Sequence, residues 1–210
     1  MHPIHEAIRQ SRRDFLTSAA SGLLVRTVGG PSARPPQPPG ISEITYAGGA
    51  HWVESTGADR YRRGLYTWFQ RTSPYPMLVT FDAPDANVCA ARRERSDTPL
   101  QALTLLNDAA FVECAQALGR RIVAESPRRD PEARIAYAFR LGLAREPTAA
   151  EAAELGRLYE TLLRQCRSAP EAAAKLAGPW KAPGVGGPEA GAWVALARTI
   201  LNLDEFVTRE

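Results

Sequence analysis

The sequence predicts a mainly α-helical protein, in which a loop-rich N-terminal part is followed by a helical bundle of about four to five helices. Two observations support this prediction. Apolar residues recur at helical spacing throughout residues 99–210. Glycines and prolines, in contrast, interrupt residues 41–98 at short intervals. We expect one domain over residues 41–210, because a chain of 210 residues has room for a single core of ordinary size.

Residues 1–40 differ in character from the rest and are interpreted as a signal followed by a linker. Residues 11–16, Ser-Arg-Arg-Asp-Phe-Leu, match the twin-arginine export pattern, and the mildly apolar residues 17–25 follow them. The proline-rich residues 31–39 predict an extended linker. A real signal implies export to the periplasm or cell envelope, whereas a chance Arg-Arg pair or a misplaced gene start implies a cytoplasmic protein.

In the loop-rich part, the spacing of glycines and prolines leaves two short elements. Residues 63–71 form one of them, and the apolar residues 77–81 are a possible strand. Helices begin after Thr98, where a capping residue, a proline and Gln101 favour initiation of a helix or helix pair that runs to about residue 125. The face of this segment that should be buried carries Phe111, Cys114, Leu118 and Ile122.

Three further helices are expected. One begins at Asp130-Pro131, turns Ile135, Phe139 and Leu143 inward and stops near Pro147. The next begins with a capping box at Thr148 and Glu151, and its apolar stripe consists of Leu155, Leu158, Leu162 and Cys166. After a loop over residues 178–188, a final helix places Trp193, Leu196, Ile200 and Leu201 in the core.

Four blocks of sequence occur in a recognisable order: residues 59–68 (DRYRRGLYTW), 81–84 (FDAP), 92–108 (RRERSDTPLQALTLLND) and 193–206 (WVALARTILNLDEF). Over residues 52–210 the chain therefore resembles the planctomycete-type domain of unknown function 1553. In that family the domain is C-terminal in large proteins and usually follows a cytochrome c domain. The resemblance implies c-type cytochromes or other envelope proteins as partners, and it assigns no activity. This chain has no Cys-x-x-Cys-His motif, so we expect no haem and no other cofactor in it.

Composition excludes several classes of function. The net charge of +3 is too small to indicate nucleic-acid binding, and no apolar run reaches the length of a membrane span. The cysteines are few and far apart, and the histidines His2, His5 and His51 lie outside the resemblance or at its edge. We therefore expect neither a metal site nor a histidine-dependent triad.

Arginines, which make up nearly all basic residues, are the best candidates for binding. Planar guanidinium groups in loops bind carboxylate, sulfate or phosphate in a bidentate manner. The candidate anion-binding residues are Arg60, Arg62, Arg63, Arg92, Arg93 and Arg95. The alternative is that they pair with nearby acids and hold the loops, because both signs of charge are interleaved along the chain.

Two weaker candidates accompany the arginines. Asp82 and Asp85 could act as a carboxylate pair in acid/base chemistry or bind a hard cation, although carboxylates around a proline are more often turn formers. The thiolate of Cys89 could be stabilised by the arginines at 92 and 93, although a buried structural thiol is the simpler interpretation. Neither feature identifies a catalytic residue.

Two functions remain open. The first is a non-catalytic interaction or scaffold module in an exported, cytochrome-associated envelope system, so that the protein is not expected to be an enzyme. The second is an enzyme or carbohydrate-active accessory domain that binds a sulfated or acidic sugar through its arginine loops. Arginines that are each paired within the chain favour the first, and arginines that converge on an open pocket favour the second.

Overall fold

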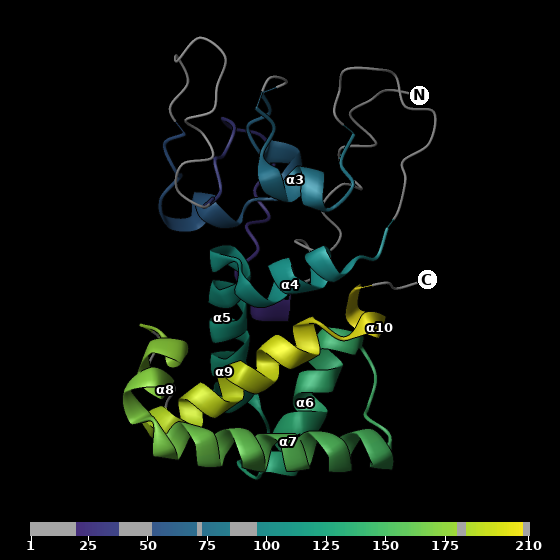
Figure 1. Cartoon of the computed structure of the whole chain (residues 1–210), viewed down its shortest axis with the longest axis vertical. Helices are drawn as coiled ribbons and strands as arrows, with labels where there is room; N and C mark the ends of the chain where they lie inside the picture. The colour runs from purple at the N-terminus through teal and green to yellow at the C-terminus, as the bar shows by residue number, and fades with distance from the viewer. Residues whose placement is uncertain (1–19, 38–51, 71–72, 85–95, 180–183, 208–210) are drawn as a thin grey trace. The chain divides into compact units, whose positions relative to one another are not determined.

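The computed structural model describes the parts of the chain numbered 20–37, 52–70, 73–84, 96–179 and 184–207. These residues form eight α-helices, α3 to α10, with only isolated β-bridges and no strand (Figure 1). The mainly helical fold predicted from the sequence is therefore confirmed. Within the described parts, no helix is both long and apolar enough to cross a membrane.

The chain divides into two compact units. Among the described residues, the first unit contains residues 24–110, and the second contains residues 20–23 and 111–207. The boundary near residue 110 places the helix over Pro99–Asn107, which was expected in the bundle, in the same unit as the loop-rich part. The expected single domain over residues 41–210 stays a prediction.

The first unit has little regular structure. It contains two 3₁₀ turns, Gly57–Tyr61 and Gly64–Tyr66, and the helices α3 (Pro76–Thr80) and α4 (Pro99–Asn107). The strand expected over residues 77–81 is wrong, because these residues belong to α3 and to the turn that ends it. Pro76 at the first helical position presets the backbone for a helix, and a short apolar run does not by itself distinguish helix from strand.

The helix start predicted at Thr98 is confirmed. The Thr98 hydroxyl accepts a hydrogen bond from the Gln101 backbone nitrogen at 3.3 Å, and the Gln101 side chain accepts one from the Thr98 nitrogen at 3.2 Å. Asp108 is extended and separates α4 from α5 (Ala109–Glu125). The segment is thus a helix pair, one of the two forms that the sequence allowed.

The second unit is a helical bundle. After α5 come α6 (Pro131–Leu143), α7 (Ala149–Ser168), α8 (Pro170–Ala177), α9 (Gly187–Leu201) and the single turn α10 (Asp204–Val207). The predicted stripes of α5, α6 and α9 are buried, and in α7 Leu155 and Cys166 are buried while Leu158 and Leu162 are partly buried against the core. Helix α8 was not predicted, because its small apolar residues give no clear stripe.

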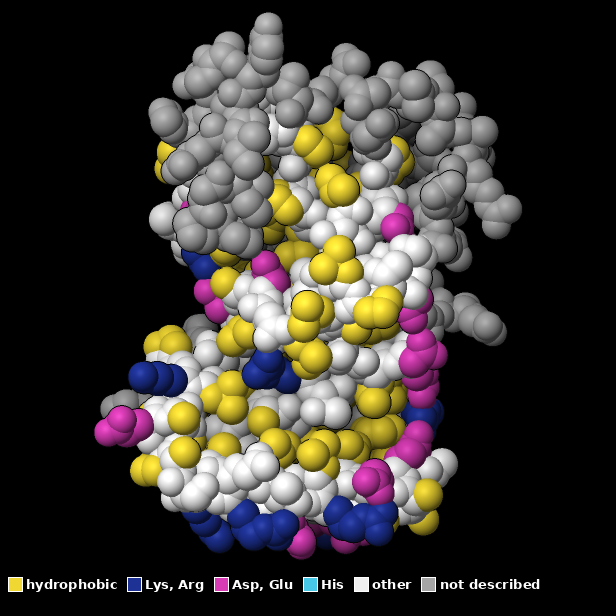
Figure 2. Space-filling model, in the orientation of Figure 1, with side chains coloured by type: hydrophobic (Ala, Val, Ile, Leu, Met, Phe, Trp, Pro, Cys, Tyr) yellow, Lys and Arg dark blue, Asp and Glu magenta, His cyan; other side chains and the backbone are white. Residues whose placement is uncertain are grey.

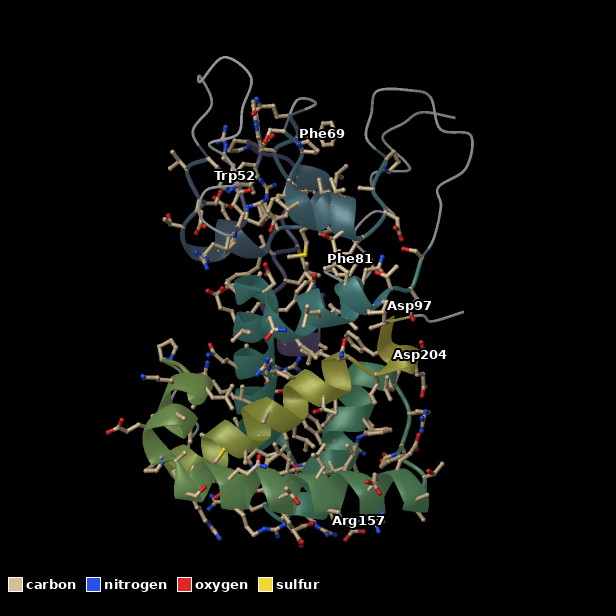
Figure 3. The ribbon with its side chains drawn as sticks, in the orientation of Figure 1. Trp52, Phe69, Phe81, Asp97, Arg157 and Asp204 are labelled. Carbon is tan, nitrogen blue, oxygen red and sulfur yellow. The ribbon has the colours of Figure 1, made fainter. Side chains whose placement is uncertain are left out.

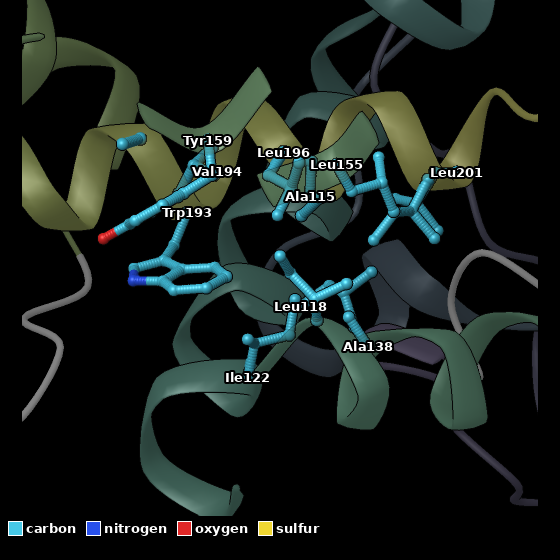
Figure 4. Packing of buried hydrophobic residues seen from close by; sticks show 14 of the residues in the cluster. Ala115, Leu118, Ile122, Ala138, Leu155, Tyr159, Trp193, Val194, Leu196 and Leu201 are labelled. Carbon is cyan, nitrogen blue, oxygen red and sulfur yellow. The ribbon is translucent and has the colours of Figure 1, made fainter. Parts of the chain in front are cut away.

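Helix α9 lies at the centre of this bundle and packs mainly on α7 and α8 (Figure 1). Trp193, Leu196 and Ile200 are fully buried in it, and side chains from α5, α6 and α7 surround them (Figure 4). Small residues allow the close approach. A Cβ added to Gly191 would lie 2.9 Å from the carbonyl oxygen of Ala173 in α8, so this position accepts only glycine without movement of a helix.

The outer face of α7 is charged, as an amphipathic helix at a bundle surface requires. Arg157, Arg164 and Arg167 on this face are exposed. Figure 2 shows Lys and Arg side chains along the edge of the molecule where α7 lies in Figure 1. Arg157 also pairs with Glu154 one turn earlier, and such exposed pairs contribute little stability. The face is interpreted as a solvated surface.

Thr148→Ala is expected to lower the free energy of unfolding by about 1 kcal/mol, the usual effect of losing a helix cap. The Thr148 hydroxyl accepts a hydrogen bond from the Glu151 nitrogen at 3.3 Å and starts α7. Chemical denaturation measures the change. Thr161→Ala, an exposed substitution in the middle of the same helix, is the control and should have no destabilising effect. An unchanged midpoint in Thr148→Ala would mean that α7 does not depend on this cap.

Acid should weaken the bundle through Glu151. Hydrogen bonds from Arg145, and next from the Thr148 backbone, lower the pKa of Glu151 to about 2 from its usual 4.5. Because the folded-state pKa is depressed, the contribution of Glu151 is complete above pH 4.5 and is lost as the pH falls toward 2. The thermal midpoint of Glu151→Gln should therefore fall less over this range than that of the unmodified protein. Parallel curves for the two proteins would contradict the assignment.

Candidate functional site

Two segments of the first unit lie side by side. The Val25 nitrogen donates to the Tyr61 oxygen at 3.1 Å, and Ala33 exchanges backbone hydrogen bonds of 2.7 Å with Tyr66 and Trp68. Residues 24–37, which include the start of the expected proline-rich linker, are thus bonded to residues 52–68. The second of these segments contains the arginines of the first sequence block.

Arg62 is the centre of this contact. Its guanidinium donates to the carbonyl oxygen of Pro31 at 2.6 Å and to that of Gly29, and it lies 3.9 Å from the centre of the Tyr66 ring. The Tyr66 hydroxyl accepts a hydrogen bond from the Gly29 nitrogen at 2.9 Å. That bond first, and then the nearby Arg63 and Arg62, lower the pKa of Tyr66. Arg62 and Tyr66 together hold the turn at Gly29.

The neighbouring arginines have different surroundings. Arg60 forms an ion pair with Glu54 at 3.5 Å. The Arg63 guanidinium lies 5.6 Å from the Tyr66 ring centre, and its Nε atom is buried with no hydrogen-bond partner among the described residues. Arg60 and Arg62 thus contact groups of the chain itself, while Arg63 lies beside Tyr66. Anion binding by these residues stays a prediction.

Aromatic side chains complete this region. The indole of Trp52, which is labelled in Figure 3, stacks on Tyr75 with ring centres 5.3 Å apart. It also donates to the carbonyl oxygen of Pro35 at 2.9 Å. Trp68 is 39% exposed, and the Arg34 guanidinium lies 4.6 Å from its ring centre. A ring with a cation against one face has only its other face left for stacking a ligand.

A second cluster joins two of the sequence blocks around Asp82. The Asp82 carboxylate accepts hydrogen bonds of 2.8 Å from the backbone nitrogen and the hydroxyl of Ser96, and one of 3.3 Å from the Gln101 amide. The Gln101 amide also donates to the Thr80 carbonyl oxygen at 2.9 Å, and the residue is only 1% exposed. This partly buried carboxylate accepts hydrogen bonds from several donors of its own chain, which is typical of a structural support.

Sequence reasoning had not identified Ser96, and it interpreted Gln101 only as part of a helix start. The signal was present, because both lie in the block that continues from the arginines at 92–95 into α4. What the sequence could not show is that Asp82, fourteen residues before Ser96, bonds to both of them. Chemically, the carboxylate could take a proton from the Ser96 hydroxyl, but no histidine is present in residues 52–210 to extend such a pair.

The remaining candidates lie outside the described residues: Arg92, Arg93, Arg95, Asp85 and Cys89. In the described parts, Cys114 and Cys166 are buried, and burial raises the pKa of the Cys166 thiol. Within the same parts, no group of three or more acidic, cysteine or histidine side chains is placed to hold a metal ion.

Asp82→Ala is expected to lower the free energy of unfolding by about 2 kcal/mol. The variant loses hydrogen bonds to a charged acceptor, and the buried amide of Gln101 is left with one acceptor fewer. Asp82 also has a φ of 59°, a left-handed conformation that asparagine tolerates better than alanine. Asp82→Asn should therefore be milder than Asp82→Ala in urea denaturation. Equal stability of all three proteins would show that the cluster is not a support.

Comparison with known families gives one finding. The family model described as "PSD1: Protein of unknown function (DUF1553)" matches residues 8–159, which is more than half of the chain. The match begins within the segment interpreted as a signal and includes all the described residues of the first unit. No curated protein and no solved structure matches the chain.

Proposed function

Because the chain belongs to the PSD1 (DUF1553) family of proteins of unknown function, we propose that it is a non-catalytic interaction or scaffold module. Its setting in this proposal is an exported, cytochrome-associated envelope system. The supporting observation is that the polar side chains best suited to chemistry are bonded within the chain. Arg62 donates hydrogen bonds to two backbone carbonyl oxygens, and the Asp82 carboxylate accepts hydrogen bonds from Ser96 and Gln101.

A scaffold also needs a surface that a partner can cover. Leu100 and Leu103 of α4 are 61% and 58% exposed, and residues three apart on a helix lie on the same face. Two leucines exposed together on one short helix suit contact with the apolar side chains of another protein. The partner in this proposal is a c-type cytochrome or a protein bound to one.

Photo-crosslinking in the native envelope tests the proposal. A photoreactive residue replaces Leu103 in the full chain, and haem staining and intact mass identify the crosslinked product. We expect a haem-positive adduct from position 103 and none from position 160, an exposed site on α7. Adducts without haem from position 103 would support a scaffold role and overturn the cytochrome association, and the absence of any adduct would overturn both.

One observation favours the alternative, a site for an acidic or sulfated sugar. The buried Nε of Arg63 has no hydrogen-bond partner in the described parts of the chain, and Arg63 lies beside a tyrosine whose pKa is lowered. Calorimetric titration with a sulfated disaccharide tests it. Binding that Arg63→Ala abolishes and Arg128→Ala leaves intact would replace the scaffold proposal.

A further inference from the structure

The described residues 24–37 are bonded along their length to the rest of the first unit. The backbone bonds at Val25 and Ala33 have been given above, and Ala33 is only 3% exposed. Further along, the carbonyl oxygen of Pro36 accepts a hydrogen bond of 2.7 Å from the Tyr75 hydroxyl, just as that of Pro35 accepts one from Trp52. Prolines lack a backbone donor, so these carbonyl bonds are how a proline-rich segment is fixed.

The turn at Gly29 and Gly30 fits the same contact. Both glycines have positive φ, 82° and 90°, a conformation that other residues rarely adopt. The Tyr66 hydroxyl and the Arg62 guanidinium bond to this turn from residues more than thirty positions later. A flexible linker does not need two glycines held at positive φ or an arginine bonded to their turn.

Residues 20–23 also make buried contacts and a hydrogen bond, but these lie within the second unit. Ala20 and Ser21 are 6% and 2% exposed, and Ala20 belongs to the hydrophobic core of the bundle. The Arg121 guanidinium donates to the Ala20 carbonyl oxygen at 2.6 Å. Residues 21–23 and α5 together line a cleft of about 290 Å³. The apolar stretch interpreted as the core of a signal therefore contributes at least Ala20 to a buried core.

From these contacts we propose that residues 20–37 are a permanent part of the folded protein, so that any processing of the N-terminus leaves the chain from Ala20 onward intact. The proposal goes beyond the scaffold function and does not depend on it. It also excludes cleavage by a signal peptidase between residues 20 and 37. The family match gives independent support, since it extends through this segment from residue 8.

A nicked chain tests the proposal directly. A recognition sequence for a specific protease is inserted after Gln37 in the full chain, and the cleaved protein is passed through a size-exclusion column. We expect the fragment that ends at Gln37 to elute with the remainder in buffer and to separate only in urea. Separation in buffer would overturn the proposal.

Two variants show whether the observed contacts are responsible. Arg62→Ala removes charge-assisted hydrogen bonds to Gly29 and Pro31, so the nicked fragment should dissociate about tenfold faster. Arg128→Ala removes an exposed pair with Asp130 in the other unit and should leave the rate unchanged. Equal rates in both variants would overturn the role of the Gly29 contact.

The natural N-terminus gives a second test that does not depend on the nick. Intact mass and N-terminal sequencing of the protein recovered from its own cells should show a chain that begins at or before Ala20. A mature chain that begins anywhere after Ala20 would overturn the proposal, most fully one that begins after Gln37. In that case the first unit would have to fold without a segment that supplies hydrogen bonds to Tyr61, Tyr66 and Trp68.

Discussion

Glu189→Ala should destabilise the protein by about 3 kcal/mol, because it leaves a buried arginine without its counter-charge. The Arg134 side chain is 5% exposed and forms an ion pair of 2.8 Å with Glu189 across α6 and α9. The same carboxylate accepts a hydrogen bond from the Trp193 indole at 3.4 Å. The effect is placed at the low end for a broken buried pair, because the Glu189 side chain is 35% exposed and water can partly replace it.

Replacement of the arginine in this ion pair should lower the free energy of unfolding much less. Arg134→Met removes the buried charge and also the Arg134 Nε, which has no hydrogen-bond partner in the described residues, while the remaining Glu189 can be hydrated. Denaturant unfolding of both single variants and of the double variant measures this asymmetry. The double variant should be more stable than Glu189→Ala alone. Equal losses in the two single variants would contradict the asymmetry.

Trp193→Ala should lower the free energy of unfolding by about 4 kcal/mol, the usual effect of deleting a large aromatic side chain from a core. Trp193 is fully buried in α9, and its ring stacks on Tyr159 of α7 with centres 4.2 Å apart (Figure 4). Because both side chains belong to the buried core cluster, removal of the Trp193 ring is expected to leave a cavity. Trp193→Phe keeps much of the volume and should lose less than half as much stability.

Tyr159 offers a second measurement of the same cavity. Burial raises the pKa of Tyr159 to about 12, with nearby Glu189 as a smaller cause. Removal of the Trp193 ring should admit water and move this pKa back toward the ordinary value of 10. Absorbance titration of tyrosinate in the folded variant follows the shift. If stability falls but the pKa of Tyr159 stays near 12, the bundle has closed over the missing ring.

Local signals allowed most of the bundle to be predicted. Capping groups at Thr98, Asp130 and Thr148 fixed three helix starts, and each cap is present with its side-chain hydrogen bond. These predictions succeed because a cap and a helical stripe depend on residues only a few positions apart. Where the local signal was weak or shared by two structures, as in α8 and α3, the prediction missed the helix or was wrong.

The sequence by itself determined the helical class, three of the helix starts, the buried faces of the predicted helices and the family. Only the tertiary structure shows which groups the polar residues and the N-terminal segment contact. Asp82 accepts hydrogen bonds from Ser96 and Gln101, and Arg62 donates one to the turn at Gly29. These hydrogen bonds join residues that are far apart in the chain. A proline-rich segment has the same composition whether it is a flexible linker or is hydrogen-bonded to the rest of a folded unit. The difference lies in the hydrogen-bond partners that the folded chain brings to its carbonyl oxygens, and no local pattern records them.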